Sequence, residues 1–577
     1  MESPFTRHIR TNFIPSDAEM KEIQGLLPKP MERLLYLETE ITRLEDILGK
    51  LYSERDSLSE TVEGHKALLS HARRLPDDIL REIFVWCLPA NHNPVISNLE
   101  APLLLTEICR NWREISLSTP RMWSRIHIPT PSVAPHNFWQ SLAEPSSSSS
   151  LLVYKVKMWL GRSGICSLSI SISASMFRTI LLDSLMPLLQ TLISFSSRWR
   201  DVAFYLPPAA WPLLTQLTAE DVPRIENIAF DNFFGPCTGF IPLIESSWTT
   251  AGILKSSNLR TLVLSRIEAD IARLPVDWSQ LTNICLRSST SWDQPQLSTD
   301  DIIYILMKCP NLLRCSLEIN GLDINPSLAE NLALQKVSLP LLERLSVVEG
   351  VHAAATRLFE SISTPSLSHV SFKMYTRIDE EGEEISSLPT LLKNTTRLES
   401  LILDTSLLTQ EDVIAVLPLI PTATRLSFVE HDSFQIPEVT FWPPPVIPNF
   451  HSGQPRRAVS DTVLGLLTPS SKNGGECFCP LLEIFECNQC DFSEAGLLKM
   501  IRARMDSSYT NIARLKRTTV AFSQHQVIDI MPDLEPFVVA GLDVKILYPD
   551  HPASSCVEEE FIPWDGLRSM DSSWPSS

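Results

Sequence analysis

The chain is 577 residues long, and hydrophobic residues make up 44% of it, which is enough apolar material for packed cores. This length predicts roughly three or four domains, or one extended repeat array. The formal net charge of −19 argues against a nucleic-acid binder, because phosphate groups are neutralised by an excess of lysine and arginine. Twelve cysteines lie scattered along the chain without a framework spacing, which favours reduced thiols in the cytosol or nucleus.

Neither a secretory signal nor a membrane span is expected. The first 25 residues carry scattered charges and no apolar segment. The most apolar stretch, 179–195, contains Asp183 and Pro187 and is shorter than a membrane span. We predict a buried helix there and a cytoplasmic or nuclear protein.

Residues 31–70 carry a heptad pattern. Residues 1–30, which precede them, are polar and proline-containing, so we expect a flexible N-terminus. Apolar residues then recur at alternating steps of three and four, a seam typical of a coiled coil and interrupted only at Arg55. The seam consists of Leu34, Leu37, Ile41, Leu44, Leu48, Leu51, Leu58 and Val62. Two interpretations stay open: a helix that folds back on its own protein, or self-pairing into a homodimer.

The segment 71–127 is expected to be a compact helical hairpin. Its first helix should follow Leu75-Pro76, begin at Asp77 and Asp78, whose charge suits a helix N-terminus, and stop at Pro89. Both helices have an apolar face, and the face of the first is wide enough to contact two surfaces. The first face holds Ile79, Leu80, Ile83, Phe84, Cys87 and Leu88, and the second holds Leu104, Leu105, Ile108, Cys109, Trp112 and Ile115. A polar loop, 91–100, separates the two helices.

A Pro- and Ser-rich linker is predicted at 128–150, and from 151 to 550 the chain repeats itself. The template is apolar-x-x-apolar-x-apolar, which predicts a short strand. Most copies lie 22 to 34 residues apart. The middle residues of the ten copies are Val202, Ile228, Leu262, Ile284, Cys315, Leu345, Val370, Leu401, Leu426 and Phe485.

Helices are expected between the strands, at 302–307 and at 413–417, the second after a capping-box pattern of Thr409 and Asp412. The template and spacing resemble leucine-rich repeats, although only Asn320 and Cys490 fill the expected Asn or Cys position. The predicted fold class is therefore α/β: an N-terminal heptad helix and a helical hairpin, followed by an irregular leucine-rich-repeat solenoid. A proline-rich insertion at 431–475, functional or merely tolerated, and a disordered tail at 551–577 complete the predicted organisation.

The helical hairpin resembles the F-box, in the form common in mushroom-forming fungi (basidiomycetes). The resemblance lies in five segments: Leu75-Pro76, Ile79-Leu80, Ile83-Phe84, Ile108 to Arg113, and Leu117 to Trp123. The last of these matches the element Leu-Ser-Thr-Pro-x-x-Trp in full. In the usual pattern Glu stands where this chain has Asp78, and the loop 91–100 lengthens the connection, which could weaken adaptor binding.

The resemblance implies a substrate-recognition subunit of a Skp–cullin–F-box ubiquitin ligase. The F-box would bind a Skp-type adaptor, through it a cullin–RING ligase, and the repeats would bind an unknown protein target. The implied adaptor contacts are Leu75, Pro76, Ile79, Leu80, Ile83 and Phe84, and the implied F-box core residues are Ile108, Trp112 and Trp123. Two alternatives stay open: an ordinary core helix pair, and a non-catalytic interaction scaffold with coiled-coil self-association and no ligase role.

No catalytic, metal or cofactor site is expected. Cys477 and Cys479, then Cys487 and Cys490, form two pairs, but only seven residues separate them and they coincide with repeat positions. The carboxylates at 379–384 form either a solvated loop or a contact for a basic partner. Phosphate-binding loops and nucleophile motifs are absent from the sequence. We therefore expect a non-catalytic protein, with no membrane or nucleic-acid partner.

Overall fold

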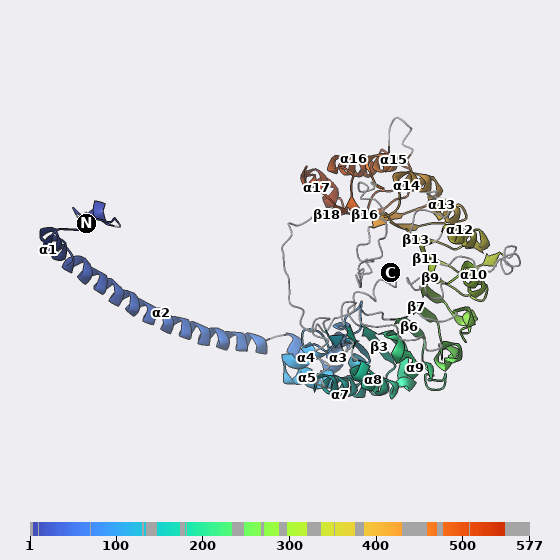
Figure 1. Cartoon of the computed structure of the whole chain (residues 1–577), viewed down its shortest axis with the longest axis horizontal. Helices are drawn as coiled ribbons and strands as arrows, with labels where there is room; N and C mark the ends of the chain where they lie inside the picture. Colours follow the sequence, from blue (N-terminus) through green and yellow to red (C-terminus); the bar gives the residue numbers. More distant parts are fainter. Residues whose placement is uncertain are drawn as a thin grey trace. The chain divides into compact units, whose positions relative to one another are not determined.

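A computed structural model describes residues 4–9, 11–69, 71–129, 132–133, 147–173, 179–180, 182–232, 247–266, 271–287, 297–319, 336–350, 352–374, 386–429, 458–469, 477–506 and 508–548. The fold is mixed α/β, with a long N-terminal helix and a large parallel sheet (Figure 1). The chain divides into two compact units, Met1–Glu82 and Ile83–Ser577. This boundary falls inside the helix α3 (Asp77–Trp86), within the predicted module 71–127.

The first unit is built from two helices, α1 (Asp17–Leu26) and α2 (Pro28–Leu68). Helix α1 lies in the segment predicted to be flexible. It begins with a capping box, in which the Ser16 backbone N–H donates to the Glu19 carboxylate at 2.8 Å. Helix α2 matches the predicted heptad segment within three residues at each end. Short 3₁₀ turns flank them at Thr6–His8 and His71–Arg74.

The second unit is dominated by a 14-stranded parallel sheet whose strand order follows the chain. Its strands are β1 (Arg125–Pro129), β3 (Leu168–Ser173), β5 (Trp199–Leu206), β6 (Asn227–Asn232), β7 (Thr261–Ser265), β8 (Asn283–Arg287), β9 (Arg314–Ile319), β11 (Arg344–Glu349), β13 (His369–Met374), β14 (Ser400–Asp404), β15 (Arg425–Val429), β16 (Ile484–Cys490), β17 (Arg517–Phe522) and β18 (Asp543–Leu547). Two small pairs lie apart from this sheet, β2 (Ser132–Val133) with β4 (Thr179–Ile180) and β10 (Val337–Ser338) with β12 (Ile362–Ser363).

Helices connect the strands and lie on one side of the sheet, the outer side of its curve (Figure 1). The α-helices of this unit beyond α3 are α4 (Leu103–Ile108), α5 (Arg110–Leu117), α7 (Ser147–Arg162), α8 (Leu182–Ile193), α9 (Trp211–Thr215), α10 (Thr299–Met307), α12 (His352–Ser361), α13 (Leu388–Lys393), α14 (Gln410–Val416), α15 (Asp461–Leu467), α16 (Glu494–Met505) and α17 (Met531–Val539). The 3₁₀ helices are Pro120–Trp123, Ser196–Arg198, Pro208–Ala210, Ser247–Thr250, Gly252–Lys255, Ile271–Arg273, Trp278–Gln280 and Leu417–Leu419.

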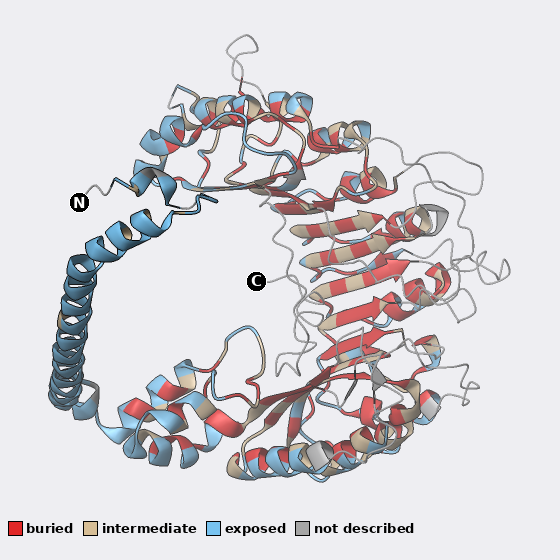
Figure 2. Ribbon diagram, turned by 60° about the vertical axis from the view of Figure 1, so that its left-hand side comes forward, coloured by how far each residue is buried: buried red, intermediate tan, exposed pale blue. Residues whose placement is uncertain are grey.

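The core runs between sheet and helices as continuous rows of side chains. The middle residues of all ten predicted templates are register partners on neighbouring strands, from Val202 on β5 to Phe485 on β16. These residues are buried. Because strand side chains alternate between faces, the residues between them point to the opposite, inner face. Figure 2 shows this as alternating red and tan bands along the strands.

Several local predictions are confirmed. The predicted buried helix at 179–195 is α8, with Leu185, Leu188 and Leu192 fully buried. Thr409 and Asp412 form the predicted capping box at the start of α14. Helix α15 lies inside the predicted insertion. Most of the remainder of 431–475, most of the linker 128–150, Asn320, the carboxylates 379–384 and the tail 551–577 lie outside the described residues. Within the described residues, no helix combines the length and apolar character needed to cross a membrane.

Candidate functional site

Helix α3 carries most of the residues implied as adaptor contacts, and it presents two apolar faces. One face is turned into the protein: Leu80 and Phe84 are only 2% and 1% exposed, and Leu88 beyond the helix end is buried too. The Phe84 ring meets the edge of Trp112 with ring centroids 4.9 Å apart. Leu80 and Phe84 therefore fill the core and present no surface to a partner, which corrects their implied role as direct contacts.

The other face of α3 is an exposed apolar stripe. Ile79 and Ile83 are 46% and 41% exposed, and Leu75, just before the helix, is 37% exposed. Trp86 continues the stripe, because positions i, i+4 and i+7 share a helix face, and its side chain is 86% exposed. Sequence reasoning missed Trp86, although its spacing from Ile79 was the signal. We call Leu75, Ile79, Ile83 and Trp86 the α3 stripe.

The second helix of the predicted hairpin is broken in two. Cys109 adopts an extended conformation (φ −159°, ψ 169°) between α4 and α5. This break turns Ile108 away from the face it was predicted to share with Trp112, and Ile108 is 55% exposed. Its predicted place in the core is therefore wrong, because the prediction assumed one continuous helix.

Trp123 anchors the hairpin to the sheet, as a core residue should. It is fully buried, and its Nε1 donates to the Ser116 carbonyl at 2.8 Å. Its ring meets the edge of Trp159 from α7 with centroids 4.9 Å apart, while the Arg162 guanidinium lies 4.7 Å from its centre. Trp123 is thus fully buried, whereas Trp112 is half-buried against Phe84.

The long loop between the hairpin helices is held against the first strand. Arg125 donates to the carbonyls of Pro89 at 3.1 Å and His92 at 2.7 Å, and also to Asn93 Oδ1 at 3.2 Å. Burial lowers the pKa of Arg125, but an arginine stays protonated in proteins. The loop 91–100 and the residues just before it are therefore held in place by an arginine on β1.

The heptad seam of α2 is exposed along its whole length. Each of its eight apolar side chains is between 44% and 59% exposed. Ion pairs within the helix, such as Arg43–Glu40 at 2.6 Å and Lys50–Asp46 at 2.6 Å, also lie on the surface. The seam is therefore left uncovered by the described residues.

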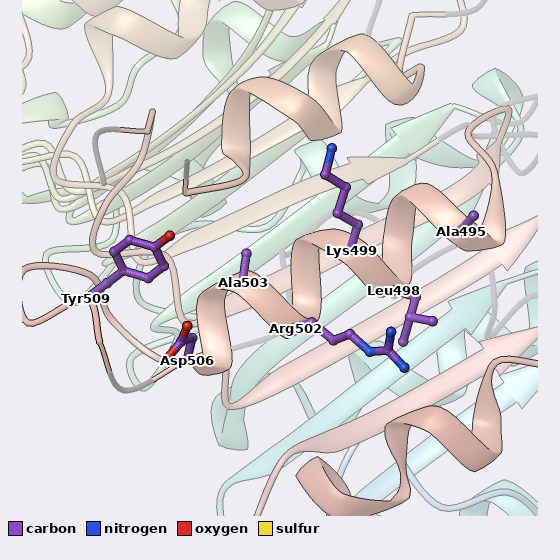
Figure 3. Close-up of a pocket in the computed structure, with 7 residues that line it drawn as sticks. All are labelled: Ala495, Leu498, Lys499, Arg502, Ala503, Asp506 and Tyr509. Atoms are coloured by element: carbon purple, nitrogen blue, oxygen red, sulfur yellow. The ribbon is translucent and has the colours of Figure 1, made fainter. Parts of the chain in front are cut away.

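Two hollows offer alternative sites. One lies over α16 and the segment after it, and is lined by Ala495, Leu498, Lys499, Arg502, Ala503, Asp506 and Tyr509 (Figure 3). Lys499 and Arg502 extend in different directions there, and Arg502 pairs with Asp533 of α17 at 2.7 Å. The other lies on the inner face of β3 to β9, between Asn93 and Arg314. The first hollow has no convergent charged groups among its lining residues, and the second is treated below.

Two of the four cysteines considered for zinc, Cys477 and Cys479, lie beside the buried Arg504. Arg504 donates to the carbonyls of Leu467, Phe478 and Cys479 at 2.8 to 3.1 Å and contacts the Cys477 sulfur at 3.6 Å. Burial raises the pKa of Cys477, and that of Cys479 to about 12, so both thiols are protonated near neutral pH. No metal-binding group of three or more His, Cys, Asp or Glu occurs within the part of the chain that the structure describes.

Comparison with models of known protein families finds no match, and no curated protein matches the sequence either.

Proposed function

We propose that this protein is the substrate-recognition subunit of a Skp–cullin–F-box ubiquitin ligase. The F-box resemblance supports the proposal, and the single observation that carries it is the exposed α3 stripe. Four large apolar side chains on and just before one helix are costly to leave in water, at about 25 cal/mol per Å² of apolar surface. A partner that covers Ile79, Ile83 and Trp86 would remove that cost.

The sheet supplies the second half of the proposal. Ten templates aligned in one buried row, with helices on a single side, support an irregular leucine-rich-repeat solenoid. Its inner face would hold the protein target. The mechanism is then proximity: target and ligase are tethered together, so the effective concentration of the target for ubiquitin transfer rises. The protein itself contributes no catalytic group, and it works in the cytoplasm or nucleus.

A second function, an interaction scaffold without a ligase role, is favoured by the exposed seam of α2. Self-association through that seam would bring two copies of the sheet domain together. The two proposals differ in one component, because only a ligase receptor needs the cullin.

Co-purification from cells tests the proposal. Full-length protein should bring down a Skp-type adaptor together with a cullin, and Ile79→Asp/Ile83→Asp should bring down neither. Val538→Asp/Val539→Asp, on the exposed part of α17, is the matched control and should behave as wild type. Recovery of the adaptor without a cullin would favour the scaffold, and unchanged recovery by the Ile79→Asp/Ile83→Asp variant would refute the role of the stripe.

A further inference from the structure

Five arginines lie in one row across the inner face of the sheet, at the first inward position of their strands. They are Arg125 on β1, Arg314 on β9, Arg344 on β11, Arg425 on β15 and Arg517 on β17. Three of them are satisfied by their own protein. Arg125 holds the hairpin loop, Arg425 pairs with Glu486 at 2.8 Å, and Arg517 pairs with Asp543 at 2.9 Å.

Arg314 and Arg344 differ from the other three, because no residue in the described ranges forms a hydrogen bond or ion pair with either side chain. They are direct register partners on neighbouring strands, which places their Cα atoms about 4.8 Å apart. Like charges directly opposite each other destabilise a sheet. The two guanidinium groups therefore repel each other, and no carboxylate of the described residues pairs with either of them, in a protein whose net charge is −19.

The surroundings of the pair suit an anionic ligand. His369, the next register partner of Arg344, has its pKa lowered by burial and by the Arg344 guanidinium, while Glu399 and Glu343 act in the opposite direction. Two residues further along the strands, Ser316, Ser346 and Ser371 form a row of hydroxyl groups in register. On the other side lies the hollow of β3 to β9, about 370 Å³ in volume, which Asn283 and Arg314 line. We call Arg314, Arg344, His369 and the three serines the arginine patch.

We propose that the arginine patch binds an extended acidic segment of a partner protein, with carboxylates on Arg314 and Arg344. Arginine forms paired hydrogen bonds with carboxylates. An extended segment crossing β9, β11 and β13 presents alternate side chains to one face, so acidic residues at every second position would reach the patch. The inference rests on the proposed function in one respect, since it names the chemistry of the target that the sheet would hold.

A protein segment fits the patch better than a nucleic acid does. Polyphosphate binding requires many cationic contacts along the backbone, and the net charge of −19 opposes it. The patch also offers no aromatic ring on which bases could stack, since its residues are arginine, histidine and serine. Two free arginines suffice for a short acidic segment.

Fluorescence anisotropy with a labelled Glu-Ser repeat peptide tests the inference on full-length protein. Arg314→Gln/Arg344→Gln should weaken binding about tenfold for each arginine, and a Gln-Ser peptide should not bind. Lys393→Gln/Arg397→Gln removes the same charge from exposed positions outside the patch and should leave the affinity unchanged. The unfolding temperature of Arg314→Gln/Arg344→Gln should not fall, because neither arginine has a side-chain partner among the described residues and the change removes two like charges that lie opposite each other.

Four results would overturn the inference: no peptide binding by wild type at low salt, equal weakening in both variants, a lower unfolding temperature for Arg314→Gln/Arg344→Gln alone, or tighter binding of a single-stranded RNA through the same arginines. Adaptor binding, measured on the same samples, separates this test from the proposed function. Loss of peptide binding with adaptor binding intact counts against the patch alone, whereas peptide binding without adaptor binding counts against the ligase role alone.

Discussion

The exposed seam of α2 leads to a quantitative prediction about self-association. The exposed area of its eight apolar side chains equals that of about four fully exposed side chains per helix, or about eight in a pair of helices. At roughly 1.5–3 kcal/mol for each fully buried side chain, pairing would yield about 12–24 kcal/mol. Association costs about 4–15 kcal/mol. The midpoints of these ranges leave about 8 kcal/mol, which corresponds to a dimer with a Kd of about 1 μM.

Replacing Leu44 and Leu48 by Asp removes the equivalent of one whole side chain per helix, or about 3–6 kcal/mol per dimer. The Kd should then rise at least about a hundredfold. Sedimentation velocity on full-length protein over micromolar concentrations measures this shift. Ser53→Asp/Ser57→Asp adds the same charge on the outer face of α2 and should dimerise like wild type. A wild-type chain that remains monomeric at about 100 μM, or a Leu44→Asp/Leu48→Asp variant that still dimerises, would refute the reasoning.

Three further predictions concern the hairpin and the sheet. Ile79→Ala/Ile83→Ala should weaken adaptor binding about 10- to 70-fold in calorimetry, because the two side chains are 46% and 41% exposed and a bound adaptor would cover that area. The unfolding temperature should not change, and an unchanged affinity would show that the α3 stripe does not contact the adaptor. Phe84→Ala should cost about 3–5 kcal/mol in urea unfolding, and a loss below about 1 kcal/mol would contradict its core position. His369 has a pKa lowered from 6.5, so the unfolded chain binds its proton first and stability falls as pH drops through about 6.5. Thermal unfolding at about pH 7.5 and 5.5 measures this fall, and the unfolding temperature of His369→Gln should drop less between the two pH values than that of wild type. An equal drop in both proteins would contradict the prediction.

The sequence predicted the middle of the sheet well, because its buried positions are apolar. All ten template centres became register partners. The strands β1 and β3 at one end of the sheet, and β17 and β18 at the other, were not predicted. In β17 the polar Thr518 occupies the buried row, and in β18 Val544 lies between charged residues, so neither segment shows the template. Pairing with a neighbouring strand, rather than local pattern, makes these segments strands.

At the hairpin the sequence predicted an apolar face but not its direction. Ile79 and Leu80 are adjacent on the one apolar face that the sequence predicted, and only packing decides that Leu80 is buried and Ile79 exposed. Ile108 was misplaced for a related reason, since the break at Cys109 is a backbone feature that periodicity does not reveal. The unpaired state of Arg314 and Arg344 also depends on which strands become neighbours.

The chain-order sheet has a consequence for how the protein loses structure. Each strand of the sheet pairs with the strands that come just before and just after it along the chain. Separation of an end strand therefore leaves the other strand pairs intact. The C-terminal edge strand β18 is partly exposed along its length and has one neighbour. Unfolding should therefore begin at β18 and proceed strand by strand toward β1. Proteases should cleave the C-terminal strands first, and the end of the sheet next to the hairpin, where Trp123 is buried, should unfold last.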